Sequence, residues 1–317
     1  MAIPKRWTWK STGSASSRVW EELDDAGLSW FHWPEALEAG SEPWKFATAL
    51  LGCRPLHLHV KQIAPLAGDV RNYENSSFTA PLHTDYHPYL PAPLQVLICH
   101  RPAQSGGDSL FLDGWELLAS IRERDPSLYA ELFESPRIIP FGPGNWFGPT
   151  LSMRLDNLIL ACGAMPPADP VGRRFVEQTR AASARSLRLE EGDVVVLNHH
   201  RLLHGRTAFS DPHRLLTRFF LWLHKPLAAE PRLAHEARRV HRRLAEQTSH
   251  HPEWIRHRLG VFGSDGLPAT AFSADPKRLP AMPDAQSPER YVELENVLRG
   301  LALRDSGCAA RTVSLAQ

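Results

Sequence analysis

The run VVVLNHHRLLHGR at residues 194–206 decides how the rest of this chain is interpreted. Its four apolar residues follow the turn EEGD at 190–193 and predict a buried strand, and histidines follow at positions 199, 200 and 204. A second stretch, His83-Thr84-Asp85, completes the pattern. Side chains alternate between faces in an extended segment, so His83 and Asp85 point the same way. A histidine nitrogen and a carboxylate on one face are two of the three ligands of a 2-His-1-carboxylate triad, the usual seat of non-haem Fe(II).

The third ligand must come from a strand that neighbours the first in space. Three histidines of the run, His199, His200 and His204, compete for this role. We favour His204, because Gly205 after it permits close backbone approach and because arginines follow. His199 and His200 lie at the end of the apolar strand, where a structural role for either is equally in keeping with the sequence.

Composition limits the classes of function. The chain has 317 residues, of which 43% are hydrophobic and 22% charged, enough for a globular core. A formal net charge of +1 argues against recruitment of nucleic acid or an acidic membrane. The four cysteines show no C-x-x-C spacing, and no apolar stretch approaches the roughly 18 residues of a membrane span. We therefore expect a cytoplasmic protein that acts on a small molecule.

Many short strands between Gly/Pro turns, with two ligand stretches far apart in sequence, predict a mainly β protein with a jelly-roll core. The expected strands are 56–60, 93–100, 109–112, 151–161, 194–197 and 214–223. The expected helices are 15–26, 42–51, 115–124, 126–134 and 171–186. The segment 140–150 around Trp146 has no regular period and is a candidate lid or a packed loop.

We expect residues 1–226 to form the jelly-roll domain with its N-terminal helices, and residues 227–317 to form a helical extension packed on it. That extension has two predicted helices, 229–248 and 288–304, and is a candidate for a homo-oligomer contact.

Two arginines follow the histidine run in an extended apolar stretch. Arg214 and Arg218 lie four apart, so they share one face of the strand. A buried guanidinium is costly unless it is paired. The two arginines therefore either form internal salt bridges or grip carboxylates of a ligand, for which their planar fork is suited.

Three linked motifs resemble one known family. They are LHTDY at 82–86, SGGDSLFLDG at 105–114, and LHGRTAF at 203–209 continuing to Arg214. In order and spacing they are similar to the Fe(II)/2-oxoglutarate-dependent dioxygenases of the taurine dioxygenase (TauD/TfdA) group, especially the γ-butyrobetaine hydroxylase branch. The resemblance covers roughly residues 50–225.

The resemblance implies a fold, cofactors and roles. The fold would be a double-stranded β-helix with helices outside. Fe(II) would be held by His83, Asp85 and His204, and the distal carboxylate of 2-oxoglutarate by Arg214, with Ser109 where the family often has threonine. O2 and 2-oxoglutarate would be consumed, succinate and CO2 released, and an unactivated C–H bond oxidised. Related halogenases have a small residue in place of Asp85, so a carboxylate there argues for an oxygenase outcome, most simply hydroxylation.

Arg218 bears on the substrate. In taurine dioxygenase-like and amino-acid hydroxylase-like relatives the corresponding arginine holds the substrate's sulfonate or carboxylate. We expect a small anionic or zwitterionic substrate, such as an amino acid or a related acid; the alternative is a structural ion pair. Tyr73, Asn75 and Tyr86 are candidates for lining the substrate pocket, with ordinary loop packing as the alternative. No Cys/His cluster precedes residue 80, so the zinc-binding domain of butyrobetaine hydroxylases is not expected.

Two other classes of function compete with this interpretation. A cupin-like metal isomerase or hydrolase could use the same His/Asp/His site with Zn(II) or Mn(II), but it would leave Arg214 and Ser109 without a shared role. The other is a non-enzymatic barrel that binds a small acid as a sensor. All three metal ligands and the arginine are present, which argues against a barrel that has lost its activity.

Overall fold

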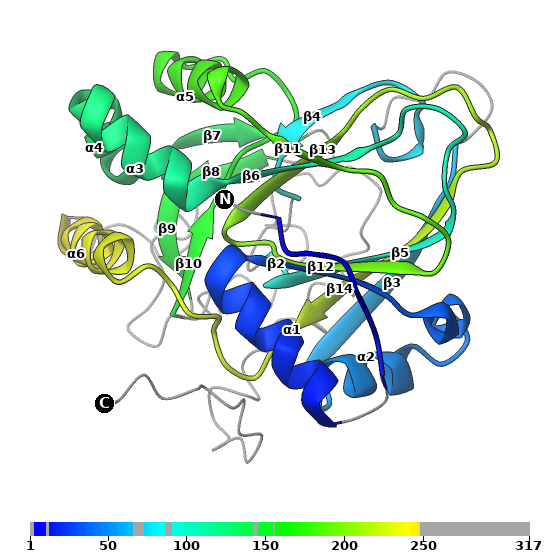
Figure 1. Ribbon diagram of the computed structural model, residues 1–317. Coiled ribbons are helices and arrows are strands. Elements are labelled where there is room, and N and C mark those ends of the chain that lie inside the picture. The colour runs from blue at the N-terminus through cyan, green and yellow to red at the C-terminus, as the bar shows by residue number, and fades with distance from the viewer. Residues whose placement is uncertain are drawn as a thin grey trace, which may run out of the picture.

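The computed structural model describes residues 3–10, 13–65, 73–85, 91–141, 145–154 and 156–247. Within these ranges two β-sheets face one another and helices cover the outside (Figure 1). The prediction of a mainly β protein with flanking helices is confirmed.

The larger sheet has six strands and the smaller one has four. The larger runs in the order β1 (Trp7–Thr8), β2 (Leu28–His32), β12 (Asp193–Asn198), β5 (Leu94–Arg101), β14 (Leu215–Trp222) and β3 (His57–Ile63). The smaller runs in the order β11 (Arg185–Leu187), β6 (Ser109–Asp113), β13 (Leu202–Arg206) and β4 (Ala80–His83). Neighbouring strands are antiparallel, except that β1 is parallel to β2.

Successive strands mostly change sheet. From β3 to β6 the chain alternates between the larger and the smaller sheet, and it alternates again from β11 to β14. The space between the sheets is therefore lined by residues far apart in sequence. An apolar cluster fills part of this space and includes Leu97, Phe111, Val195, Leu202 and Leu216.

Strand β12 explains why its sequence is continuously apolar rather than alternating. Val195 and Leu197 face the cluster between the sheets, whereas Val194 and Val196 face the helices outside. A strand buried on both faces needs apolar side chains on both.

Helices cover both outer faces (Figure 1). α1 (Gly13–Ala26) and α2 (Pro43–Leu51) lie on the larger sheet and share a core cluster with it. A second cluster joins α3 (Gly114–Arg124), α4 (Pro126–Glu134), α5 (Pro170–Ala181) and α6 (Pro231–Gln247) to the hairpin of β9 (Leu151–Arg154) and β10 (Asn157–Leu160). Short 3-10 helices span Pro34–Glu38 (η1) and Tyr73–Asn75 (η2). As the Asp125-Pro126 pair predicts, Asp125 Oδ1 accepts a hydrogen bond from Leu128 N (3.0 Å) and begins α4.

Three boundaries differ from the sequence-based expectation. The expected strand 151–161 is a hairpin, because the chain reverses at Asp156, whose φ of 58° is left-handed. The expected helix 171–186 ends at Ala181, and β11 begins at Arg185. The segment 140–150 is partly regular, since β8 (Asn145–Gly148) pairs with β7 (Arg137–Pro140). The side chain of Trp146 lies outside the described residues, so a lid role for it stays a prediction.

The predicted helix 229–248 is α6, which packs on α4 and β9 through Leu233, Ala237 and Val240. The predicted helix 288–304 lies outside the described residues. The division at residues 226/227 and the oligomer contact therefore stay predictions. No helix in the described part of the chain is both long enough and apolar enough to cross a membrane.

Candidate metal centre

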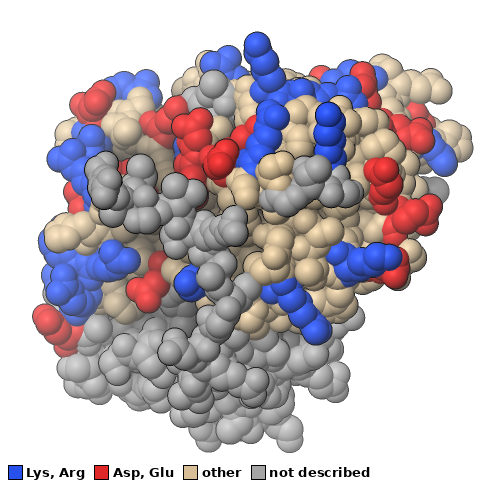
Figure 2. Space-filling view, turned by 60° about the horizontal axis from the view of Figure 1, so that its bottom comes forward, with Lys and Arg blue, Asp and Glu red and all other residues tan. Residues whose placement is uncertain are grey.

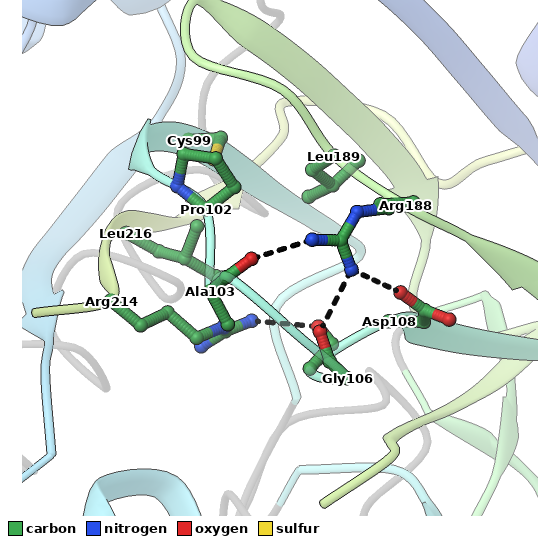
Figure 3. A pocket seen from close by; sticks show the side chains of 10 residues that line it. Cys99, Pro102, Ala103, Gly106, Asp108, Arg188, Leu189, Arg214 and Leu216 are labelled. Carbon is green, nitrogen blue, oxygen red and sulfur yellow. Dashed lines mark hydrogen bonds and ion pairs between the residues drawn. The ribbon is translucent and has the colours of Figure 1, made fainter. Parts of the chain in front are cut away.

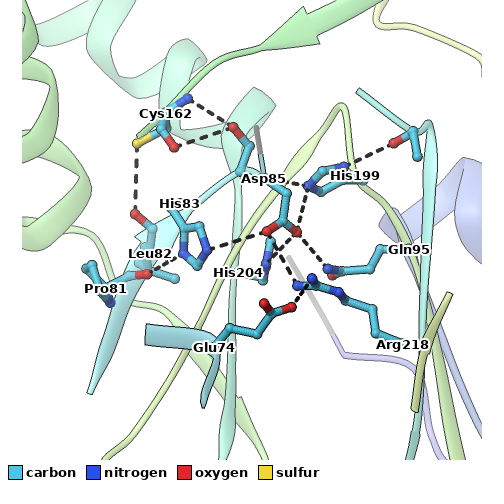
Figure 4. A network of polar contacts seen from close by, with 12 residues as sticks. Glu74, Pro81, Leu82, His83, Asp85, Gln95, Cys162, His199, His204 and Arg218 are labelled. Atoms are coloured by element: carbon cyan, nitrogen blue, oxygen red, sulfur yellow. Dashed lines mark hydrogen bonds and ion pairs between the residues drawn. The ribbon is translucent and has the colours of Figure 1, made fainter. Parts of the chain in front are cut away.

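Two strands of the smaller sheet bring the predicted ligands together. His83 ends β4 and is paired directly with His204 of β13, and their rings lie 4.5 Å apart. One ligand atom each of His83, Asp85 and His204 lies within 4.8 Å of the others (Figure 4). The three side chains predicted from sequence thus converge, and their role as metal ligands stays a prediction.

Local contacts explain why the two side chains of the H-x-D stretch point inward. Thr84 between them is buried and points the other way, where its N donates to Cys162 O (2.8 Å) and its Oγ1 accepts from Cys162 N (3.0 Å). Gly205 lets β13 approach β4, because a Cβ at this position would lie 2.8 Å from Ala80 O. The close approach predicted for Gly205 is confirmed.

Both histidines of the cluster are held as neutral rings. His83 Nδ1 donates to Pro81 O (2.7 Å), which leaves Nε2 facing Asp85 Oδ1 at 3.9 Å. Burial lowers the pKa of His83 and lowers the pKa of His204 to about 4, although Asp85 opposes the shift in both. At neutral pH both rings therefore have the uncharged form that binds metal ions.

Asp85 is kept ionised by its neighbours. Burial alone would raise its pKa, but the Arg218 guanidinium and His204 outweigh it and hold the pKa well below its usual range. Gln95 Nε2 donates to Asp85 Oδ2 (2.7 Å), and His204 Nε2 lies 3.2 Å from the same oxygen. A carboxylate oriented in this way is a ready ligand for a cation.

The geometry separates His204 from its two competitors. His199 accepts a hydrogen bond from Asp85 N at Nε2 (2.9 Å) and donates from Nδ1 to Ala92 O (3.0 Å). Both of its ring nitrogens are thus occupied by backbone groups, Nε2 by Asp85 N and Nδ1 by Ala92 O. Its Nε2 also lies 3.4 Å from Asp85 Oδ2, but a ring that accepts at Nε2 has no proton there to share with the carboxylate. His200 is bonded to Pro91 O (2.7 Å), and burial lowers its pKa to about 3. The choice of His204 as the third ligand is therefore supported by the backbone hydrogen bonds of His199 and His200.

Arg218 lies beside the ligand cluster and is ion-paired, as the alternative of a structural salt bridge expected, whereas its role toward a substrate stays a prediction. Its Nη2 contacts Glu74 Oε1, and its Nη1 lies 3.5 Å from Asp85 Oδ1. Glu74 Oε2 in turn contacts Lys61 Nζ. The side chains of Arg218 and Glu74 are each 12% exposed, at the edge of the ligand cluster.

Arg214 is a buried cation with few polar contacts in the described part of the chain. It is 5% exposed, lies 5.2 Å from the ring centre of Phe209, and reaches Gly107 O only at 3.5 Å. Within the described ranges it forms no ion pair with an acidic side chain, and burial lowers its pKa. It lines a pocket with Cys99, Gly107 and Leu216, among others (Figure 3).

Arg206 is a second buried arginine, and the sequence-based reasoning missed it. It lies 4.7 Å from the ring centre of Phe209, and its Nη2 donates to the carbonyls of Tyr73 (3.2 Å), Ser76 (2.7 Å) and Phe78 (2.7 Å). Burial, and to a smaller extent the positive charge of Arg214, lowers the pKa of Arg206 to about 10. Two guanidinium groups therefore flank one phenyl ring.

Ser109 faces the same interior as the ligands. It is 4% exposed and is paired across the sheet with Arg206, two residues from His204, so all three share the inward face.

The sequence-based reasoning also missed Gln95, Glu74 and Lys61. The one usable signal was Gln95, an amide within the apolar run of residues 94–99.

The candidates for lining the substrate pocket have different surroundings. The amide of Asn75 donates to Ala64 O (3.2 Å), which is ordinary loop packing. The carbonyl of Tyr73 accepts from Arg206. Tyr86 lies outside the described residues, and its role stays a prediction. His100 is hydrogen-bonded to Thr217 Oγ1 (2.7 Å).

Comparisons with known proteins confirm the resemblance inferred from the motifs. Residues 56–144 match the family model described as taurine catabolism dioxygenase TauD, TfdA family. That match contains His83, Asp85 and Ser109 and ends before His204. The chain is also 31% identical over 157 residues to gamma-butyrobetaine dioxygenase of Pseudomonas sp. (strain AK-1). This second match covers 43% of the chain and 41% of the relative, so the chain spans less than half of the relative's length.

Solved structures with this fold include an asparagine oxygenase in complex with Fe(II), hydroxyasparagine and succinate. Its TM-score is 0.52 at 16% identity, covering 65% of this chain and 77% of that one. The non-haem iron oxygenase OrfP, in complex with Fe and alpha-ketoglutaric acid, has a TM-score of 0.48 at 19% identity, covering 67% and 80%. At such identities the likeness to the first structure concerns the fold alone.

Proposed function

We propose that this protein is an Fe(II)- and 2-oxoglutarate-dependent dioxygenase that hydroxylates a C–H bond of a small anionic or zwitterionic acid. The observation that carries the proposal is the convergence of His83, Asp85 and His204 in an interior that also contains the buried Arg214, which pairs with no acidic side chain in the described ranges. The matches to the TauD/TfdA family model and to a butyrobetaine dioxygenase support it.

The strand order supports a double-stranded β-helix as the finer description of the fold. If the eight strands β3–β6 and β11–β14 are numbered in chain order, the larger sheet reads 1-8-3-6 and the smaller reads 2-7-4-5. Each pair of neighbours is antiparallel, as closure of such a barrel requires.

The donor set fits Fe(II). Two neutral imidazoles and one ionised carboxylate converge at one point, which is the 2-His-1-carboxylate arrangement. His83, Asp85 and His204 would hold the metal, which together with bound 2-oxoglutarate and O2 supplies the oxidising power for C–H hydroxylation. Gln95 donates to the Asp85 carboxylate and His199 holds the Asp85 backbone, so the orientation of this side chain does not depend on the metal.

Arg214 and Ser109 are proposed to bind 2-oxoglutarate. A guanidinium at 5% exposure, with no acidic partner among the residues that the structure describes, carries a desolvation cost that a carboxylate would relieve. Ser109 offers a hydroxyl on the inward face of β6. A metal isomerase or hydrolase uses no 2-oxoglutarate, so neither residue would have this binding role.

Arg218 is proposed to hold the acidic group of the substrate. It lies 3.5 Å from Asp85, so a carboxylate on it would be next to the metal. The names of the relatives point to carboxylic acids that also bear an ammonium group, butyrobetaine and asparagine. Tyr73 and Tyr86 are proposed to line the pocket for the rest of the substrate.

We expect the protein to act without nucleic acid or membrane as a partner. Basic and acidic side chains are interspersed over the face seen in Figure 2, with no field of one sign. A cytoplasmic location and a homo-oligomer contact through the C-terminal helices remain predictions from the sequence.

The decisive experiment is an anaerobic optical titration of the apoprotein with Fe(II) and then with 2-oxoglutarate. The chelate of 2-oxoglutarate on Fe(II) gives a weak charge-transfer band in the visible, and small acids can then be screened for perturbing it. A band that appears supports the cofactor assignment, and a perturbing acid is a substrate lead. If intact, iron-loaded protein gives no band, the Zn(II) or Mn(II) isomerase or hydrolase becomes the better explanation.

A further inference from the structure

We propose that Glu74 is a positioning residue that draws the Arg218 guanidinium away from Asp85 and so keeps the Asp85 carboxylate available to a divalent metal. The inference rests on the metal site of the proposed function. It concerns how this chain prevents one of its own cations from competing for a metal ligand.

The register of the larger sheet places two cations on one face. Arg218 of β14 is paired directly with Lys61 of β3, so their side chains leave the sheet on the same side. Glu74, in η2, lies between them, with one oxygen on Arg218 Nη2 and the other on Lys61 Nζ. One carboxylate thus bridges two cations.

Arg218 stands between two carboxylates, and its distances to them are unequal. It contacts Glu74 directly, whereas Asp85 Oδ1 is 3.5 Å from Nη1, beyond a good charged hydrogen bond (Figure 4). A guanidinium at 12% exposure needs a carboxylate partner. Without Glu74, the nearest acid in the described part of the chain is Asp85.

A closer pair between Arg218 and Asp85 would oppose metal binding. Asp85 Oδ2 already accepts from Gln95 and lies beside His204, so Oδ1 is the oxygen that Arg218 would take. A metal would then have to break a charge-assisted bond before it could coordinate. Such a bond contributes enough to weaken metal affinity about tenfold.

The position of Glu74 is set from the ligand strand itself. Arg206, two residues after His204, donates to the carbonyls of Tyr73, Ser76 and Phe78 on both sides of Glu74. This clamp fixes the segment that carries Glu74 relative to the proposed metal ligand. Lys61 has a second use: when a substrate anion takes Arg218, Glu74 keeps a cationic partner, and no buried charge is left alone.

The test is a double-mutant cycle on metal affinity, measured by calorimetry with Co(II) and the apoprotein in the absence of 2-oxoglutarate. Glu74→Gln keeps the shape and removes the charge, and should weaken Co(II) binding about tenfold. In an Arg218→Met background the same substitution should change the affinity less than about twofold. Glu42→Gln is the matched control, since Glu42 pairs with Lys45 at the surface (2.8 Å), and should leave the affinity unchanged.

Three results would overturn the proposal. An unchanged Co(II) affinity in Glu74→Gln would show that Arg218 does not compete for Asp85. An equal loss in both backgrounds would show that Glu74 acts on the metal only through its own charge. Lys61→Gln, which removes the Lys61 cation from Glu74 and leaves Arg218 in place, should bind Co(II) at least as tightly as the wild type, and a tenfold loss would contradict the mechanism. This last variant also keeps the test open if Glu74→Gln fails to fold.

The two proposals fail separately. Co(II) binding requires no 2-oxoglutarate, so a missing Fe(II)–2-oxoglutarate band would end the proposed function and leave the cycle interpretable. Conversely, an additive cycle together with a normal band would remove the role of Glu74 alone.

Discussion

Arg214→Met should separate ligand binding from stability. Arg214 is 5% exposed, and its hydrogen bond to Gly107 O is 3.5 Å long. A carboxylate gripped by both arms of the guanidinium gains two charged hydrogen bonds of about 1.5–3 kcal/mol each. Losing them should cost about 3 kcal/mol or more, so the Kd for 2-oxoglutarate should rise at least about 100-fold.

The same substitution should cost the ligand-free protein little. A buried guanidinium without an acidic partner pays for its desolvation, so replacing it by an apolar side chain of similar length should change the free energy of unfolding by less than about 1 kcal/mol, or raise it. Arg206→Met is the matched control, because Arg206 lies on the same Phe209 ring but donates to three carbonyls. It should lower the free energy of unfolding by about 2–3 kcal/mol.

The assays are the anaerobic charge-transfer titration for 2-oxoglutarate and urea unfolding of the metal-free protein. Two outcomes would refute the reasoning about Arg214. One is a Kd for 2-oxoglutarate within about threefold of the wild type. The other is a loss of stability in Arg214→Met as large as that in Arg206→Met, which would make Arg214 a structural residue.

Three further predictions follow from the same contacts. His204→Ala should abolish turnover and weaken Fe(II) binding, measured by succinate release and calorimetry; near-normal activity would return the ligand role to His199 or His200. Arg218→Ala should raise the KM for the acidic substrate far more than the KM for 2-oxoglutarate, and equal changes would show that its partner is misassigned. The pKa of His200 is lowered to about 3 by burial, against about 6.5 in the unfolded chain, so the unfolded state takes up the proton first as the pH falls. The free energy of unfolding should therefore fall by up to about 2 kcal/mol between pH 7 and pH 5 because of this residue. The urea midpoint of His200→Asn should depend less on pH than that of the wild type. An equal pH dependence would show that the His200 ring is solvated.

Much of the secondary structure could be predicted because its signals are local. The Asp125-Pro126 pair begins α4 as expected, and Gly27 and Gly52 follow the ends of α1 and α2 with φ of 72°. The errors came where tertiary pairing decides. Apolar and polar residues alternate from Leu151 to Asp156 as they would in one long strand, and packing against α6 and α4 distinguishes the hairpin from such a strand.

The choice among the three histidines shows the same limit within the site. All three follow one strand, and their spacing does not say where either ring nitrogen points. The structure occupies His199 with Asp85 N and Ala92 O, and His200 with Pro91 O, and places His204 opposite His83. The partners of the first two come from the segment before β5, about a hundred residues away along the chain.

The sequence by itself determined the chemistry available: the ligand types of the H-x-D stretch, the alternation that turns His83 and Asp85 to one face, and the arginines four apart. These follow from side-chain identity and strand periodicity, which are local properties. Only the tertiary structure decided what each charge faces. Glu74 and Lys61 reach Arg218 through the pairing of β3 with β14 and the clamp of Arg206 on the η2 segment. Electrostatic partners depend on distance in space, and distance in space between remote segments is set by sheet register and burial, which no single stretch of sequence encodes.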